Sequence, residues 1–285
     1  MKLYFFYSKT RKFSCVMTRK LSDTLSRNFF HSCGMVSRMN ARMASANCFC
    51  RTRSILEKIK KLFSRRVEQD IYRQTIGDVK VQSFSGYKLV SYEKDGQFDY
   101  EAYRRVQEAG NKRKLNSVFV LEEVIHGIAD HARSSGVVRR VLCHGTRNAA
   151  EQGFFKGAIP GVDVIGTEIS ETATQFPDTI QWDFHDLKDE WINAFDILYS
   201  NSWDHSFDPE KLFKAWSSCV APGGIMALEH TSRHEPGAVN ALDPFGVTLE
   251  GLVDLVSVNS TLTKEAILTF EAKRPRRIVI FRKPT

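Results

Sequence analysis

The sequence predicts an α/β protein built on a mostly parallel seven-stranded sheet, with helices on both faces and an antiparallel hairpin at the C-terminus. From about residue 98, short β-rich runs alternate with segments of helical periodicity, which is the pattern of parallel strands joined by helices. Residues 265–284 instead hold two β-rich runs joined by a short basic turn, and strands joined so closely pair antiparallel.

Two helices are expected first, at residues 98–115 and 117–136, the second closed by Gly136. His126 and His131 lie five positions apart on the second helix, so they do not share a face. We therefore expect ordinary surface or packing histidines there rather than metal ligands.

Strands and helices then alternate. A helix starting at Asn148 is expected to use Asn148 as its N-cap and Glu151 as the third helical residue. A short helix is expected around residues 171–175, and a longer one begins at the cap residue Asp208 and leads to the Pro-Gly-Gly turn at 222–224. The five expected strands are residues 137–144, 162–168, 179–184, 195–202 and 224–230.

Small or polar residues follow the first four strands, where doubly wound sheets bind their ligands. Gly145 has no Cβ and lets a ligand approach the backbone. Glu168 stands where an acid accepts hydrogen bonds from ribose hydroxyls, and we expect its carboxylate to face an open cleft. Asp183 is placed to contact an adenine-type amino group, and residues 200–202 are small and polar. Small or polar residues at the carboxyl ends of four strands of one sheet predict a cofactor site.

A resemblance to a known family rests on three stretches. VLCHGTRNA (residues 141–149) stands where class I S-adenosylmethionine-dependent methyltransferases, in particular the methyltransferase type 11 group, have an acidic strand and a glycine-rich loop. VIGTEIS (164–170) looks like the family's second-strand motif, which ends in the ribose-binding acid. HSFDPEKLFKAWSSCVAPGG (205–224) is similar to its His-x-x-Asp-Pro helix and Pro-Gly-Gly turn. The C-terminal hairpin matches the family's antiparallel edge, which NAD-binding Rossmann domains lack.

The resemblance covers the chain from about Arg139 to Pro284. It implies a Rossmann-like fold, S-adenosylmethionine as the cofactor and methyl transfer as the activity. Together with the strand-end positions, it gives nine expected cofactor-binding residues: Gly145, Thr146, Arg147, Glu168, Ile169, Asp183, Phe184, Ser200 and Asn201.

The first turn departs from the family's pattern. Cys143 replaces the usual acid, and Arg147 and Ala149 occupy positions where the family commonly has glycine. One hypothesis is that Arg147 contacts the cofactor carboxylate, and the other is that it faces solvent at the helix start. The competing function is a non-catalytic S-adenosylmethionine-binding module, or pseudoenzyme, with a degenerate glycine loop.

Methyl transfer to oxygen or nitrogen also calls for a general base. Asp204 and His205 follow the fourth strand and His230 ends the fifth, so all three are expected on the ligand-binding rim. The two histidines are the candidate catalytic residues, and for both a structural or acceptor-shaping role stays open. We expect no metal, because spacing alone gives little support to a zinc site built from Cys143, His144 and distant histidines.

No motif encodes the acceptor. The long loop at residues 231–248 and the helices between Phe98 and Gly136 are expected to cover the site and to select the substrate. The net charge of +8 comes from residues 1–66, which hold 16 of the 41 Lys and Arg residues and only two acids. The rest of the chain is acidic, which favours a small-molecule, sugar or lipid-linked acceptor over nucleic acid.

Three regions are expected along the chain: a basic leader or targeting segment (1–66), a linker or small extension (67–97) and the methyltransferase domain (98–285). Residues 54–66 read as a basic amphipathic helix suited to a membrane surface, but no apolar run is long enough to span a bilayer. The leader is either a mitochondrial or plastid transit peptide, or else a disordered leader or upstream sequence translated from a wrongly chosen start. An intracellular protein is expected in both cases, cytoplasmic in the second. No Cys-x-x-Cys pair occurs, and we expect free thiols.

Overall fold

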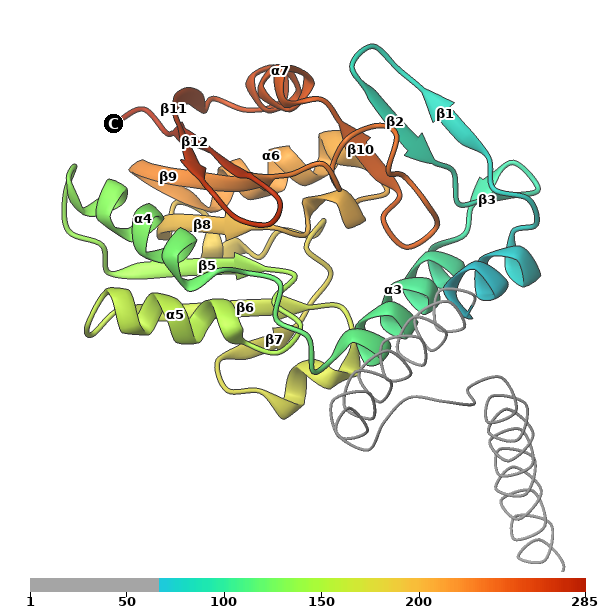
Figure 1. Ribbon diagram of the computed structural model, residues 1–285, viewed down its shortest axis with the longest axis horizontal. Coiled ribbons are helices and arrows are strands. Elements are labelled where there is room, and N and C mark those ends of the chain that lie inside the picture. The colour runs from blue at the N-terminus through green and yellow to red at the C-terminus, as the bar shows by residue number, and fades with distance from the viewer. Residues whose placement is uncertain (1–66) are drawn as a thin grey trace, which may run out of the picture. The chain divides into compact units, whose positions relative to one another are not determined.

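The computed structural model describes residues 67–285, so the predicted leader and its amphipathic helix at 54–66 lie outside the described residues (Figure 1). No helix within the described part of the chain is both long and apolar enough to cross a membrane.

A seven-stranded sheet forms the centre of the molecule, in the order β11-β12-β9-β8-β5-β6-β7. All neighbours from β9 to β7 pair in parallel, whereas β12 is antiparallel to both β9 and β11. The predicted fold class is therefore confirmed. The strands are β5 (Arg140–His144), β6 (Asp163–Glu168), β7 (Thr179–Gln181), β8 (Phe195–Ser200), β9 (Val220–His230), β11 (Thr263–Phe270) and β12 (Arg276–Arg282).

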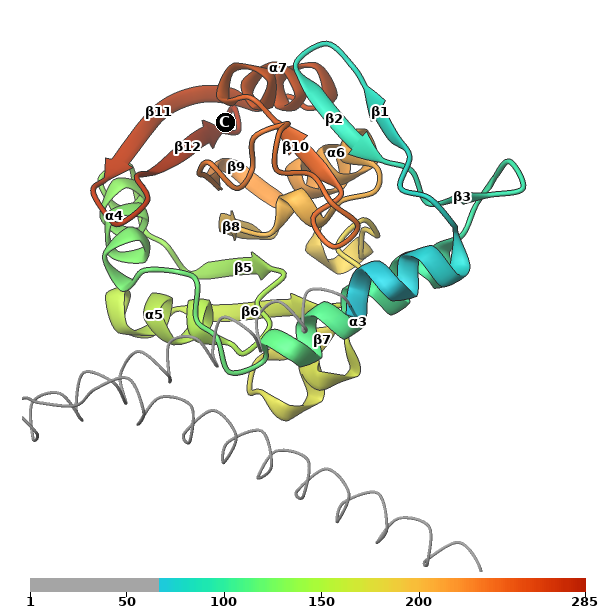
Figure 2. The same cartoon turned by 45° about the vertical axis from the view of Figure 1, so that its right-hand side comes forward.

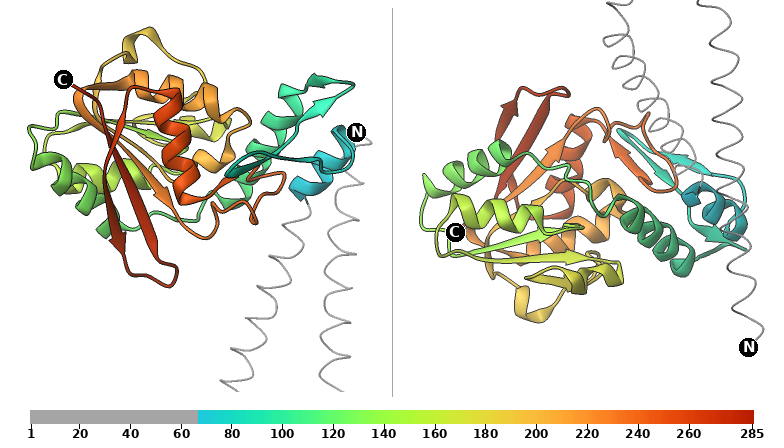
Figure 3. Two further views of the ribbon diagram at one scale, coloured as in Figure 1. Left: turned by 90° about the horizontal axis from the view of Figure 1, so that it is seen from above. Right: turned by 60° about the horizontal axis from the view of Figure 1, so that its bottom comes forward.

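Helices cover both faces of this sheet (Figure 3). On one face lie α4 (Glu122–Arg133) and α5 (Ala150–Ala158), and on the other lie α6 (Pro209–Cys219) and α7 (Leu249–Asn259). Successive strand residues point to opposite faces, so Ile197 packs under α4 and α5 while Leu198 packs under α6 and α7. Burial on both faces explains why the central strands read as continuous apolar runs.

Two predicted helix starts are wrong. The second helix begins at Glu122 rather than residue 117, because Leu121 is extended and the carbonyl of Ser117 accepts hydrogen bonds from the turn after β5. The helix expected to begin at Asn148 begins at Ala150, and Asn148 does not cap it. Its Nδ2 instead donates 2.9 Å to the carbonyl of Leu115. Tertiary contacts have taken the side chain away from the capping role.

Several ends also move by a few residues. β7 stops at Gln181 and β8 at Ser200, whereas β9 begins at Val220 and takes in the predicted Pro-Gly-Gly turn. Asp208 caps α6 as predicted, accepting 3.0 Å from the backbone N–H of Lys211. The short helix at Glu171–Gln175, η1, is a 3-10 helix.

Residues 67–98 pack against other parts of the described chain. Residues 67–75 are helical, and the strands that follow are β1 (Val81–Ser83), β2 (Tyr87–Val90), β3 (Glu93–Lys94) and β4 (Gln97–Phe98). β2 pairs with β10 (Phe245–Val247), which lies inside the predicted long loop. Tyr92 donates to the carbonyl of Ala241, so this segment and the loop form one layer over α3 (Tyr100–Lys114).

Candidate functional site

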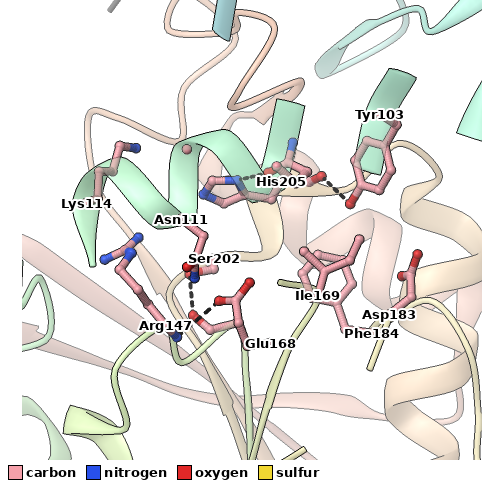
Figure 4. Close-up of a pocket in the computed structure, with 13 residues that line it drawn as sticks. Tyr103, Asn111, Lys114, Arg147, Glu168, Ile169, Asp183, Phe184, Ser202 and His205 are labelled. Atoms are coloured by element: carbon pink, nitrogen blue, oxygen red, sulfur yellow. Dashed lines mark hydrogen bonds between the residues drawn. The ribbon is translucent and has the colours of Figure 1, made fainter. Parts of the chain in front are cut away.

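A cavity of about 490 Å³, open mouth included, lies at the carboxyl ends of β5, β6, β7 and β8. In Figures 1 and 2 the arrowheads of β5 and β6 point towards α3, which forms the opposite wall. The lining residues are Tyr103, Gln107, Gly110, Asn111, Lys114, Gly145, Arg147, Glu168, Ile169, Asp183, Phe184, Ser202 and His205 (Figure 4).

Five lining residues come from one face of α3, hereafter the roof helix. Their spacing of four, three, one and three residues follows the turn of an α-helix, so one face looks into the cavity. The loop at residues 231–248, hereafter the covering loop, packs closely against Gly110. A Cβ at that position would lie 2.3 Å from a methyl group of Leu242. Sequence reasoning did not single out these residues, although a run of Tyr, Gln, Gly, Asn and Lys at helical spacing was a usable signal.

The turn after β5 keeps left-handed backbone at positions without glycine. Gly145 has φ +75°, and a Cβ there would lie 2.7 Å from Ser202 Cβ. Arg147 (φ +48°) and Ala149 (φ +59°) also lie in the left-handed region, at about 1–2 kcal/mol each. These are the two positions where the resembling family commonly has glycine. The chain thus retains left-handed, glycine-like backbone at both positions, with different side chains.

Glu168 ends β6 with its carboxylate turned to two backbone donors. Oε2 accepts from the N–H of Arg147 (3.2 Å) and Oε1 from that of Ser170 (3.1 Å). The residue is only 7% exposed, and its burial raises the carboxyl pKa despite these bonds and the nearby Arg147 charge. The expectation of a carboxylate in an open cleft was therefore wrong. Glu168 lines the cavity and also holds the turn after β5.

Asp183, which follows β7, is already hydrogen-bonded. Its Oδ1 accepts from the backbone N–H (2.9 Å) and the Nδ1 (2.7 Å) of His185, and its Oδ2 accepts from the Tyr100 hydroxyl (2.8 Å). Burial alone would raise the pKa of this carboxyl, but the His185 and Tyr100 bonds lower it. Asp183 is thus ionised, and Tyr100 links it to the roof helix.

Three of the nine predicted cofactor residues do not line the cavity. Thr146 is buried and accepts 3.3 Å from Gln152. Ser200 is buried, donating 3.0 Å to the carbonyl of His144, and the Asn201 amide oxygen accepts 3.0 Å from the Ser202 hydroxyl. These side chains shape the turns behind the cavity. The six that do line it are Gly145, Arg147, Glu168, Ile169, Asp183 and Phe184.

Two cations stand at one end of the cavity, Arg147 from the turn and Lys114 from the roof helix (Figure 4). The Arg147 guanidinium lies 4.8 Å from the centre of the Phe119 ring, and the Lys114 ammonium lies 6.0 Å from it. Within residues 67–285 neither has a carboxylate within 4 Å. Burial lowers the pKa of both side chains, which is the response of cations short of a counter-ion.

Two of the residues that line this cavity carry donors without a partner. Arg147 Nε and Asn111 Nδ2 are buried and have no hydrogen-bond partner among the described residues. A buried donor without a partner costs about 1–3 kcal/mol, so a polar ligand here would relieve both. The cavity therefore suits a ligand with acceptor atoms near its cationic end.

The two candidate histidines differ in position. His205, in the 3-10 turn η3 (Trp203–His205), lines the cavity and contacts Gln107 through Nδ1 at 2.7 Å. His230 is fully buried outside the cavity lining, with Nε2 2.9 Å from the carbonyl of Val247. Asp204 is also buried away from the lining, and burial raises the pKa of its carboxyl to about 7. Of these three residues, only His205 lines the cavity.

His131, His144 and the two described cysteines lie outside the cavity lining. His131 pairs with Glu265 at 2.6 Å. Cys143 and Cys219 are buried free thiols, and burial raises the pKa of both. His144 bonds Thr167 through Nδ1 at 2.8 Å, and the described residues contain no cluster of three or more His, Cys, Asp or Glu residues arranged to hold a metal.

No protein-family model matches this sequence, and no curated protein matches it. Solved structures do. The 1,6-didemethyltoxoflavin-N1-methyltransferase of Burkholderia thailandensis, solved with S-adenosylhomocysteine, has 13% identity and a TM-score of 0.52, covering 72% of this chain and 100% of that one. The N-methyltransferase NodS of Bradyrhizobium japonicum has 14% identity and a TM-score of 0.48, covering 63% and 99% of the two chains. The first likeness, with the strand order, shows that the chain has the class I methyltransferase fold.

Proposed function

We propose that this chain, with its class I methyltransferase fold, is an S-adenosylmethionine-dependent methyltransferase acting on a small-molecule, sugar or lipid-linked acceptor. The observation that carries the proposal is the cavity. It collects six of the nine residues expected at a cofactor site, from the ends of three neighbouring strands, and one histidine beside them. If each of these residues only ended its own strand, there would be no reason for all six to line the same cavity.

The residues present fit the cofactor. Glu168 would accept hydrogen bonds from the ribose hydroxyls, and Asp183 with Phe184 would hold the adenine. Gly145 and Arg147 would hold the methionine end, where the buried Arg147 Nε lacks a partner and the cofactor offers a carboxylate. Arg147→Ala is then expected to weaken S-adenosylhomocysteine binding about tenfold by calorimetry, from loss of one charge-assisted hydrogen bond. Unchanged affinity would remove Arg147 from the site.

When bound, S-adenosylmethionine supplies an electrophilic methyl group. His205 is the group in the cavity suited to take the proton that an oxygen or nitrogen acceptor must release. Burial lowers the pKa of His205 even though Asp204 and Asp243 oppose the shift, so its imidazole is neutral and can accept a proton near pH 7.

The competing function is a binding module without catalysis. It is favoured by one observation: Glu168 and Asp183 already accept hydrogen bonds from within the protein. A cavity whose carboxylates are satisfied needs no ligand for its own stability. The two functions differ in whether labelled methyl reaches an acceptor.

Thermal unfolding with and without ligand tests the cofactor first. Both S-adenosylmethionine and S-adenosylhomocysteine should raise the melting temperature, since a ligand that binds only the folded state stabilises it. Labelled S-adenosylmethionine with a metabolite extract should then yield a labelled small molecule. A thermal shift without any labelled product favours the binding module, and the absence of both contradicts each function.

A further inference from the structure

Gln107 of the roof helix is 5% exposed and holds one fixed amide orientation. Its Nε2 donates 2.9 Å to the carbonyl oxygen of Leu242 in the covering loop. A carbonyl oxygen can only accept, so the amide NH₂ must face Leu242. The amide oxygen Oε1 therefore points the other way.

That direction leads to His205. Gln107 Oε1 lies 2.7 Å from His205 Nδ1. Because an amide oxygen also only accepts, the hydrogen between them must belong to Nδ1. A neutral imidazole carries a hydrogen on one nitrogen only, so the lone pair sits on Nε2. One backbone carbonyl thus sets the tautomer of His205 through Gln107.

The charged groups around His205 come from four elements. Asp204 belongs to the same 3-10 turn, Asp243 to the covering loop, Lys114 to the roof helix and Arg147 to the turn after β5. Asp243 Oδ1 lies 3.6 Å from Nε2. The two carboxylates favour the imidazolium and the two cations disfavour it, and burial shifts the balance so that the pKa of His205 is lowered.

We propose that Gln107 is a positioning residue, which holds His205 in the tautomer whose Nε2 can receive the acceptor's proton. Its effect on catalysis rests on the proposed function. As the acceptor bonds to the methyl carbon, the carbon–sulfur bond breaks and its electron pair stays on sulfur. The acceptor's proton moves to Nε2, and the resulting imidazolium lies between Gln107 Oε1 and Asp243. The imidazolium then releases this proton to solvent.

The tautomer can be measured on the full chain without any substrate. In ¹⁵N spectra, wild-type His205 should show a protonated Nδ1 and a bare Nε2 at pH above its pKa. Gln107→Leu removes the acceptor and should lose that preference, whereas Arg105→Gln, on the exposed side of the same helix, should keep it. A wild-type ring with its hydrogen on Nε2 overturns the proposal.

The rate of methyl transfer to acceptors in the metabolite extract measures the effect of Gln107 on catalysis. Gln107→Leu should slow transfer at least about tenfold, with S-adenosylhomocysteine affinity within about threefold of wild type. Gln107→Glu retains the size and places a carboxylate on Nδ1, which favours the imidazolium. The acid limb of its pH–rate profile should move up by about one unit or more. Should Gln107→Leu fail to fold, this shift decides the matter.

The two possible failures are distinguishable. If Gln107→Leu transfers methyl at the wild-type rate while His205→Ala has lost transfer, Gln107 has no positioning role and the methyltransferase proposal stands. If Gln107→Glu leaves the acid limb in place, the proposal is likewise overturned. If the wild-type protein transfers no methyl group, the proposed function fails and the catalytic role of Gln107 fails with it, whatever the tautomer.

Discussion

The two walls of the cavity are built differently. The sheet wall consists of strand ends, where Glu168 and Asp183 are fixed by bonds to nearby backbone and side chains. The roof wall consists of α3 and the covering loop; Gln107 of α3 contacts His205 Nδ1, and Asp243 of the loop lies 3.6 Å from its Nε2. Under the proposed function, we expect a division of labour in which the sheet wall fixes the cofactor and the roof wall governs the acceptor and its proton. The predictions below test that division.

The largest effect is expected from His205→Ala. Loss of a general base should reduce methyl transfer by about 100-fold or more, because such groups contribute roughly 10²–10⁴. S-Adenosylhomocysteine affinity, measured by calorimetry, should change by less than about threefold. His126→Ala, on the exposed side of α4, is the matched control and should behave as wild type. Full activity in His205→Ala would leave the cavity without a histidine base.

Glu168→Ala should affect binding first. Two hydrogen bonds from ribose to a carboxylate, each worth about 1.5–3 kcal/mol, predict a loss of S-adenosylhomocysteine affinity of more than about tenfold. Glu168→Asp should lose less. Because the carboxylate also accepts from Arg147 and Ser170, the ligand-free melting temperature should fall too. Asp163→Ala, at the exposed start of the same strand, is the control. A fall in stability with unaltered affinity would make Glu168 purely structural.

The pH dependence of the methyl-transfer rate should report the protonation state of His205. The pKa of His205 is lowered from its ordinary 6.5, so the neutral base predominates at pH 7 and above. As pH falls through that lowered pKa, the ring gains a proton and the rate should drop about tenfold per unit. His205→Ala should lose this limb from its profile. A limb centred above 6.5 would contradict the account of His205 burial.

Ala149→Gly probes the turn on the sheet wall. Ala149 has φ +59°, and glycine adopts that conformation without the steric penalty. The substitution should stabilise the protein by up to about 1 kcal/mol, measured as a rise in the denaturant midpoint. Gly145→Ala is the opposite control and should destabilise, because its Cβ would meet Ser202. A loss of stability in Ala149→Gly would mean that the turn adopts another conformation.

Removal of residues 1–66 should have the smallest effect on either wall. A chain that begins at residue 67 keeps the helix at 67–75, in which Tyr72 is buried against Tyr92. Its melting temperature and S-adenosylhomocysteine affinity should match those of the full chain. A start near Gln82 would cut β1 and remove Tyr72, and should be less stable. If the chain from residue 67 aggregates while the full chain stays soluble, the leader belongs to the fold.

The residues of the sheet wall were predictable from sequence, whereas for the roof wall only the covering elements were predictable and not their contacts. Strand ends follow from local patterns: a buried run stops, and Glu168 or Asp183 comes next. The roof depends on contacts between distant residues, such as Gln107 with Leu242 and with His205. No spacing in the sequence encodes these. Asn148 illustrates the same limit, since its local pattern fits an N-cap but its side chain bonds Leu115.

A crystal structure of the full chain with S-adenosylhomocysteine is the most direct test of this division of labour. The account predicts both ribose hydroxyls on the Glu168 carboxylate, the adenine beside Asp183 and Phe184, and the sulfur atom facing the side of the cavity that holds His205. Ligand bound elsewhere, or bound here with its ribose away from Glu168, would contradict it.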